Sequence, residues 1–344
     1  MCRAVFYDPD RPWDGKKYGR NLLLLCAYLN IDLRIPQKRI AVFLKEILGF
    51  DFSNNTINKL KEKAARLYRE TYERLLNKVI NGKLIHADET AVNLEGRTGY
   101  VWVFASLEEV VYVYTPSRES DLVQRLLKDF KGVLVTDFYA AYDSIPCQQQ
   151  KCLLHLVRDL NDDLIREPFN EEIKGLVADF ASLVRPMVET VSRFGLKAHF
   201  LKRHKKRVDV FFKNLSRHTY RTETAVKCKA RFEKNRRTLF TFLDYDGVPW
   251  NNNNAEHAIK AIALLRRNLA GLSTERALGD SLILLSACET CRFKGVSFLD
   301  FLRSGMTDID DYVSSRTKHS RGTAERRQGT EIGSPIPRGN TFLP

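Results

Sequence analysis

Neither a membrane span nor a secretion signal is evident in the sequence. It contains no run of about 18 apolar residues, the length that a membrane-spanning helix needs, and the apolar cluster at 22–29 is too short to cross a bilayer. The first residues are rich in aspartate and do not have the pattern of a signal peptide. We therefore expect no membrane association and a location in the cytoplasm.

Cysteine is sparse and scattered. Among the seven cysteines, Cys288 and Cys291 form a Cys-x-x-Cys pair, and no second such pair accompanies it. A four-cysteine zinc site is therefore not expected, and we interpret the cysteines as reduced thiols. A Gly-x-x-x-x-Gly-Lys loop, a Gly-x-Ser-x-Gly elbow and a His-Glu-x-x-His helix are also absent, which argues against the enzymes that those motifs mark.

Positive charge, in contrast, is abundant. Lys and Arg number 56 against 42 Asp and Glu, which gives a formal net charge of +14 and an isoelectric point near 9.4. A field of this sign favours a polyanion, and nucleic acid is the commonest one in a cytoplasm. A basic protein with a basic tail and no such partner fits the charge equally well.

Residues 1–80 are predicted to be mainly helical. An apolar stripe marks a helix that ends at Gly49, and Ser53 is a candidate N-cap for a long helix over 56–79. Two helices joined by so short a turn form a candidate helix-turn-helix, although a pair that only packs on the next domain or on a second subunit fits the same pattern. The basic residues near the start of the second helix are Lys59, Lys61, Lys63 and Arg66.

From residue 81 the pattern changes to strands, with β-branched and aromatic residues in short runs. The predicted strands are 84–88, 100–106, 110–114 and 132–137, the predicted helices are 120–130 and 139–142, and 152–160 is either a strand or the start of a helix. Residues 160–245 are helical and basic, and the last clear helices are 255–269 and 278–290. This order predicts an α/β fold, an α+β mixed sheet with helices on its faces.

Two aspartates close buried strands. Asp88 follows the apolar run 83–87, and Asp137 follows 132–136. A carboxylate at such a position loses solvation unless something compensates it. If the two strands are parallel neighbours, both carboxylates emerge at one edge of the sheet, where ligands and metals collect.

A third carboxylate, Glu256, lies in the first turn of the helix that Asn252, Asn253 or Asn254 can cap. Facing the two aspartates, it would complete a site for Mg²⁺ or Mn²⁺, with two ions about 3.5–4 Å apart. By spacing alone, solvated loop carboxylates are the simpler interpretation.

Five local segments resemble, in this order, those of the insertion-sequence-sixty-six family of DDE transposases. They are His86-Ala87-Asp88-Glu89-Thr90, Thr136-Asp137-Phe138-Tyr139-Ala140-Ala141-Tyr142, Cys152-Leu153-Leu154-His155, Asn252-Asn253-Asn254-Ala255-Glu256, and Arg266-Arg267-Asn268 with Gly271 and Ser273. Phe138 stands where the family usually has Gly, and Leu153-Leu154 replace a usual Trp-Ala pair. Neither departure removes a ligand.

The resemblance implies a ribonuclease-H-like core with Asp88, Asp137 and Glu256 as catalytic metal ligands. It implies cleavage and strand transfer at insertion-sequence ends, double-stranded DNA as partner, a homo-oligomer on DNA and association with the nucleoid. A decayed or domesticated protein that binds DNA without cutting it, and a nuclease without strand transfer, are the alternatives.

The predicted regions are 1–80, the helical N-terminal region; 81–160, the first part of the core; 161–250, a basic helical insertion; 251–310, the last part of the core; and 311–344, a disordered basic tail.

Further residues are predicted to support this site. His155 and Cys152 match the family's Cys-x-x-His, and Glu89 and Asn253 adjoin the acidic motifs. A zinc ion on Cys152 and His155 would need two more ligands, for which Cys288 and Cys291 are the available pair. These two lie at the end of an apolar helix, so buried thiols are the favoured interpretation and zinc is the alternative. Glu89 is expected on the strand face opposite Asp88, Asp143 is a further rival carboxylate, and His86 is expected in the core or beside the site.

Basic residues are predicted to contact DNA in two places. Lys260, Arg266 and Arg267 lie along the Glu256 helix, where a solvated helix face is an equal alternative. The run at 202–207 is better explained by binding to the duplex backbone; its DNA-contact candidates are Lys202, Arg203, Lys205, Lys206 and Arg207.

Overall fold

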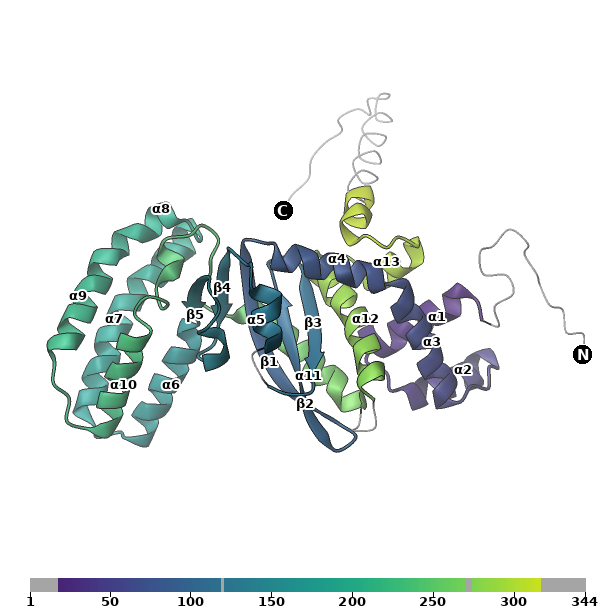
Figure 1. Cartoon of the computed structure of the whole chain (residues 1–344), viewed down its shortest axis with the longest axis horizontal. Coiled ribbons are helices and arrows are strands. Elements are labelled where there is room, and N and C mark those ends of the chain that lie inside the picture. Colours follow the sequence, from purple (N-terminus) through teal and green to yellow (C-terminus); the bar gives the residue numbers. More distant parts are fainter. Residues whose placement is uncertain (1–17, 119–120, 270–273, 317–344) are drawn as a thin grey trace, which may run out of the picture.

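The computed structural model describes residues 18–118, 121–269 and 274–316. Figure 1 shows three parts side by side: a helical bundle at one end, a sheet in the middle, and the N-terminal helices at the other end. None of the helices in these described ranges is long and apolar enough to cross a bilayer. Residues 1–17 of the predicted N-terminal region lie outside the described residues.

A five-stranded mixed sheet forms the centre, in the order β3-β2-β1-β4-β5. The strands are β1 (Leu84–Leu94), β2 (Arg97–Ala105), β3 (Val110–Thr115), β4 (Val133–Thr136) and β5 (Gln148–Lys151). The first three form an antiparallel meander, whereas β4 runs parallel to both β1 and β5. This mixed sheet, with helices packed on it, confirms the predicted α/β class and the ribonuclease-H-like arrangement.

One strand prediction was wrong in extent, and of the two alternatives for 152–160 the helix is confirmed. β1 does not end at Asp88 but continues to Leu94, because its second half pairs with β2. The strand after β4 is the polar segment β5, and Cys152 instead begins the helix α6 (Leu153–Arg166). Gln150 is fully buried in β5, where its side chain donates to the Leu239 carbonyl and accepts from the Phe242 N–H.

The edge of the sheet at β3 is covered by the helix α12 (Glu275–Phe293). Its hydroxyl groups take the place of a neighbouring strand, since Ser286 accepts from the Tyr112 N–H and Thr290 accepts from the Val110 N–H, each at 3.1 Å. α12 is buried on all sides between the sheet and the N-terminal helices (Figure 1). These two backbone N–H groups at the edge of the sheet thereby have hydrogen-bond partners.

The N-terminal part consists of short helices packed against α12. They are α1 (Arg20–Ala27), η1 (Tyr28–Asp32), α2 (Gln37–Leu48), α3 (Asn54–Leu67) and α4 (Arg69–Ile80). Gly49 ends α2 with a φ of +70°, and the Ser53 hydroxyl caps α3, both as predicted. The predicted single helix over 56–79 is wrong, because the chain breaks at Tyr68, whose ring is buried against Phe301.

α2 and α3 form the predicted helix pair, but Lys61 does not face solvent. It is 1% exposed, and its ammonium donates to the Ser281 hydroxyl of α12 at 2.9 Å. Burial lowers its pKa to about 8, and Asp280 partly opposes this. Lys61 therefore holds α3 to α12, and the prediction that it contacts DNA is wrong, while Lys59, Lys63 and Arg66 are exposed.

A helical bundle lies between β5 and the Glu256 helix in the sequence. It comprises α6, α7 (Glu171–Phe194), α8 (Ala198–Leu201), η3 (Lys202–His204), α9 (Lys205–Arg217), α10 (Glu223–Lys234) and η4 (Thr241–Leu243). Its apolar core is shared with the sheet, because Leu153 and Leu156 of α6 belong to the same buried cluster as Val133 and Val135 of β4. The bundle is thereby anchored on the β4–β5 side of the sheet (Figure 1).

The chain after α12 continues in α13 (Phe298–Ser304). Residues 309–316 are also helical, and Tyr312 is buried against Phe301. The prediction of disorder from residue 311 is therefore wrong for 311–316, and the rest of the predicted tail lies outside the described residues.

Candidate active site

Asp88 and Asp137 emerge where β1 and β4 part. The parallel pairing of the two strands ends at His86 and Val135. Asp88 lies two residues beyond that point on β1, and Asp137 directly follows β4. Each carboxylate is oriented by a backbone N–H: Asp88 accepts from Glu89 at 2.8 Å and Asp137 accepts from Tyr139 at 2.9 Å.

Glu256 reaches the same edge from the helix α11 (Asn253–Leu269), which packs against β1 and β2. The link is Asn252, the residue before α11, which is fully buried. Its side-chain amide donates to the Ala87 carbonyl at 2.9 Å, and its Oδ1 lies 3.1 Å from His86 Nδ1. Because alternate residues of a strand share a face, His86 and Asp88 both point toward the start of α11.

Asp88 lies within the electrostatic field of both Asp137 and Glu256. Burial raises the pKa of Asp88 to about 7; the Glu89 N–H opposes this rise, and the charges of Asp137, Glu89 and Glu256 add to it. A carboxyl group so placed is ionised at neutral pH only at a cost, which a divalent cation between the acids removes. The donor set is all oxygen, as Mg²⁺ and Mn²⁺ prefer.

The acids are spread rather than clustered at one point. In the described ranges, the metal-ligating side chains whose donor atoms all lie within 4.8 Å of one another are Cys152, His155 and Glu256, and this group does not include the aspartates. The donor atoms of Asp88, Asp137 and Glu256 therefore do not all lie within 4.8 Å of one another.

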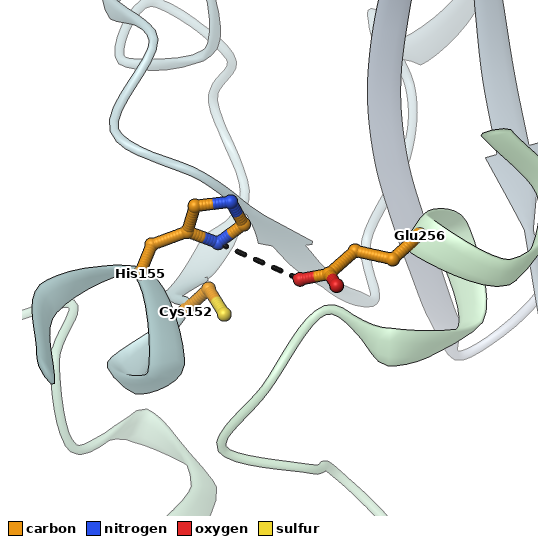
Figure 2. Close-up of side chains that lie close together, drawn as sticks. All are labelled: Cys152, His155 and Glu256. Carbon is orange, nitrogen blue, oxygen red and sulfur yellow. Dashed lines mark ion pairs between the residues drawn. The ribbon is translucent and has the colours of Figure 1, made fainter. Parts of the chain in front are cut away.

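Cys152 and His155 lie beside Glu256. Cys152 precedes α6, and its sulfur accepts from the Asn252 N–H at 3.3 Å. His155 lies in the first turn of α6, and its Nδ1 is 3.8 Å from Glu256 Oε1 (Figure 2). Cys288 and Cys291 are buried in α12, as expected for packed thiols, and Cys288 contacts Asp32 of η1, so the alternative of a zinc site with Cys152 and His155 does not form.

The rival carboxylates are engaged elsewhere. Glu89 lies on the face opposite Asp88, where it accepts from the Tyr142 hydroxyl at 2.8 Å and pairs with Arg118 at 2.6 Å. Asp143 pairs with the buried Lys151 at 3.0 Å and with Lys234 at 3.1 Å. Asn253, predicted to support the site, is exposed, and the buried contacts are made by its neighbour Asn252.

Two arginines that the sequence did not single out flank the segment after Asp137. The Arg118 guanidinium lies 4.0 Å from the ring centroid of Tyr139, and the Arg231 guanidinium lies 4.1 Å from that of Phe138. Arg231 also pairs with Asp159 of α6 at 2.6 Å. The available signal was Phe138 itself, an aromatic residue where the family usually has Gly, but its partner lies about 90 residues away in the chain.

The predicted DNA-contact residues fall in separate places. Lys260, Arg266 and Arg267 are exposed along α11, and Arg266 donates to the Ala91 carbonyl at 2.6 Å. The run at 202–207 spans η3 and the start of α9 and borders a groove that also contains Gln148, at the amino end of β5. Since Cys152 follows the carboxyl end of that strand, the run lies toward the opposite end of β5 from the acids.

The members of this run differ in their contacts. Lys205 pairs with Asp244 at 2.6 Å, and Arg203 donates to the Thr190 hydroxyl at 2.8 Å. Lys202, Lys206 and Arg207 are exposed and form no ion pair with a carboxylate in the described part of the chain. These three side chains are therefore available to a polyanion.

A mixed five-stranded sheet with acids at the edge between β1 and β4 places the protein in the ribonuclease-H-like class. Within this class, residues 15–279 match the family described as "Transposase IS66 family". The chain belongs to that family.

Two curated relatives come from Sinorhizobium fredii (strain NBRC 101917 / NGR234). Protein y4qI is 23% identical over 267 residues, which cover 68% of this chain and 49% of the relative. Protein y4hP is 21% identical over 343 residues, which cover 87% of this chain and 60% of the relative. The chain thus spans about half to three fifths of the length of these relatives, whose names state no activity.

Proposed function

We propose that this protein is a DDE transposase that cleaves DNA at insertion-sequence ends and transfers the freed strand to a target. The observation that carries the proposal is the position of Asp88 and Asp137 where β1 and β4 part, with Glu256 close enough for its charge to act on Asp88, whose pKa is raised first by burial and then by the charges of Asp137, Glu89 and Glu256. Membership of the IS66 transposase family supports the same reaction class. Carboxylates that repel one another in the metal-free protein are suited to binding divalent cations.

The residues have distinct roles in this proposal. The charges of Asp137 and Glu256 both act on Asp88, and these three carboxylates would together hold the divalent ions. When bound, Mg²⁺ or Mn²⁺ ions activate an attacking oxygen and stabilise the leaving oxygen of an in-line displacement. The backbone N–H groups of Glu89 and Tyr139 hold the two aspartates in place, and Asn252 holds the start of α11 against β1.

Double-stranded DNA is the proposed substrate. Arg118 and Arg231 flank the acids, and the exposed Lys202, Lys206 and Arg207 extend positive charge over the helical bundle. A homo-oligomer that holds two ends together is expected from the family. Recognition of the insertion-sequence ends is proposed together with cleavage and strand transfer.

The test is a cleavage and joining assay with Mg²⁺ on DNA that carries both ends of the insertion sequence. Wild-type protein is expected to give cleaved and joined products, and Asp137→Ala to give neither. Asp129→Ala, at an exposed aspartate after α5 (Asp121–Leu127), is the matched control and should behave as wild type. Cleavage without joining would identify a nuclease, and DNA binding without cleavage would identify a non-catalytic protein.

A further inference from the structure

One group of side chains beside the acids has a different chemistry from the acids themselves. The sulfur of Cys152, a ring nitrogen of His155 and a carboxylate oxygen of Glu256 all lie within 4.8 Å of one another. Figure 2 shows the His155 ring and the Glu256 side chain reaching toward each other from α6 and α11, with the Cys152 sulfur beside them. The set offers sulfur, nitrogen and oxygen from two elements that are distant in the sequence.

Two of these atoms lack a partner. His155 Nδ1 and Glu256 Oε1 are both buried, and neither has a hydrogen-bond partner among the described residues. Their separation of 3.8 Å is too long for a direct hydrogen bond. A buried polar atom left unsatisfied costs about 1–3 kcal/mol, and one cation between them would satisfy both.

The backbone at the starts of α6 and α11 fixes the positions of Cys152, His155 and Glu256. Cys152 and His155 are three residues apart at the start of α6, so their side chains fall on one face of the helix. The Asn252 N–H donates to the Cys152 sulfur; burial raises the pKa of this thiol, and the N–H contact partly opposes that rise. Asn252 also begins α11, since it accepts from the Glu256 N–H at 3.1 Å. A single residue thus fixes the positions of both ligand-bearing helices.

We propose that Cys152, His155 and Glu256 form a site for a transition-metal ion of the Zn²⁺ class, which shares Glu256 with the magnesium site. Thiolate, imidazole and carboxylate together select Zn²⁺ or Co²⁺, and three protein ligands leave the fourth tetrahedral position open. Mg²⁺ prefers oxygen ligands and does not select this set. This site needs no contribution from Asp88 or Asp137.

Sharing Glu256 has a regulatory consequence, which rests on the proposed function. A carboxylate that is drawn toward Cys152 and His155 is withdrawn from the aspartates. Zn²⁺ binding therefore removes one ligand from the catalytic ions and inhibits Mg²⁺-dependent cleavage. Removing Cys152 or His155 relieves that inhibition.

Binding is tested first, without DNA. Metal-free full-length protein is titrated with Co²⁺, and the sulfur-to-metal charge-transfer absorption is followed, with Zn²⁺ as the competitor. Wild type is expected to bind one ion with this absorption, and Cys152→Ser and His155→Ala to weaken binding by at least about tenfold. Cys147→Ser, at a partly buried cysteine on another segment, and Asp137→Asn should bind as wild type. Thermal unfolding confirms that each variant is folded, and His155→Gln replaces any variant that is not.

Two outcomes of the titration overturn the site: no sulfur-to-metal absorption in wild type, or the same absorption in Cys152→Ser. Inhibition is then tested by adding Zn²⁺ to the Mg²⁺ cleavage assay and comparing the ratio of rates with and without it for each protein. If Zn²⁺ lowers the cleavage rate of wild type about tenfold but leaves the rate of His155→Ala unchanged, the sharing of Glu256 is supported. Binding of Zn²⁺ without inhibition overturns the sharing, whereas Co²⁺ binding in a protein that never cleaves DNA overturns only the proposed function.

Discussion

Asn252 and His86, 166 positions apart in the chain, meet in a buried contact of 3.1 Å between Oδ1 and Nδ1. The Asn252 amide donates to the Ala87 carbonyl, so its Oδ1 is free to accept, and His86 must carry its proton on Nδ1. Burial lowers the pKa of His86 to about 4, and the contact with Asn252 partly opposes this, so the ring is neutral at pH 7. The pair joins the start of α11 to β1, two residues before Asp88.

Asn252→Ala is expected to impair both stability and cleavage. The substitution leaves the Ala87 carbonyl and the His86 N–H buried without their partner, at a cost of about 1–3 kcal/mol in the free energy of unfolding. It also frees Glu256 to move relative to Asp88, and the rate of Mg²⁺-dependent cleavage should fall about tenfold or more. Urea unfolding and single-turnover cleavage measure the two effects.

Asn253→Ala provides the matched control, because Asn253 is adjacent but exposed. It should change the free energy of unfolding by less than about 0.5 kcal/mol. Equal effects of the two substitutions would show that Asn252 does not hold α11 in place.

The metal-free protein should lose stability as the pH rises through 7. In the unfolded chain Asp88 has its ordinary pKa of 3.8, whereas in the folded protein burial and the neighbouring acids raise it to about 7. The folded state keeps a proton that the unfolded state has released, so this contribution is fully present below about pH 4 and is lost above pH 7. Asp88→Asn should raise the free energy of unfolding at pH 8 by about 1–3 kcal/mol.

This gain should disappear near pH 4, where the carboxyl is protonated in both states. Urea titrations at pH 5 and 8 with a chelator, on wild type, Asp88→Asn and the exposed-site control Asp129→Asn, make the comparison. Added Mg²⁺ should stabilise wild type at pH 8 more than Asp88→Asn. If wild type becomes more stable than Asp88→Asn between pH 5 and 8 without metal, the three acids do not repel one another.

Ser286→Ala should destabilise the sheet through its edge. The Ser286 hydroxyl accepts from the Tyr112 N–H at 3.1 Å, and β3 is the edge strand of the sheet formed by the described residues, so no neighbouring strand there replaces this contact. A buried N–H without a partner costs about 1–3 kcal/mol, and Thr290→Val should have a similar effect at Val110. Denaturant unfolding measures both, with Ser182→Ala on the exposed face of α7 as the control. A change below about 0.5 kcal/mol in Ser286→Ala would argue against this role of α12.

The places of the three acids in the fold could be predicted from their local sequences, while their role as metal ligands stays a prediction. Asp88 and Asp137 each follow an apolar strand segment, and Glu256 follows the asparagines that precede a helix. The end of β1 could not be predicted in the same way. Glu89 interrupts the apolar pattern, and the fold accommodates it with Tyr142 and Arg118, which local sequence does not reveal.

Buried polar residues account for most of the remaining differences. β5 is polar because Gln150 and Lys151 find partners on η4, β4 and Asp143, so no apolar run marks the strand. Nothing in the sequence indicates that Lys61 will donate a hydrogen bond to Ser281, 220 positions away. α12 also lacks an apolar stripe, because it is buried on every side.

Arginines at the acidic edge and basic residues on the bundle should affect DNA binding and cleavage differently. Arg231 stacks on Phe138, next to Asp137, whereas Lys206 and Arg207 lie at the start of α9. Each phosphate contact that is lost should reduce the slope of log affinity against log salt by about 0.9. Arg231→Gln removes about one contact and should therefore reduce the slope by about 0.9. The double variant Lys206→Gln with Arg207→Gln removes about two contacts and should reduce it by about 1.8.

Cleavage at saturating DNA separates the two surfaces. Arg231→Gln should lower the rate by about tenfold or more, because a contact beside the acids positions the scissile phosphate. The double variant should cleave at the wild-type rate once DNA is saturating, since its contacts only hold the duplex. Fluorescence anisotropy across a salt series gives the slopes, and single-turnover cleavage gives the rates. If the double variant loses rate while Arg231→Gln does not, the scissile strand follows the outer surface of the bundle and the acids at the sheet edge are not where DNA is cut.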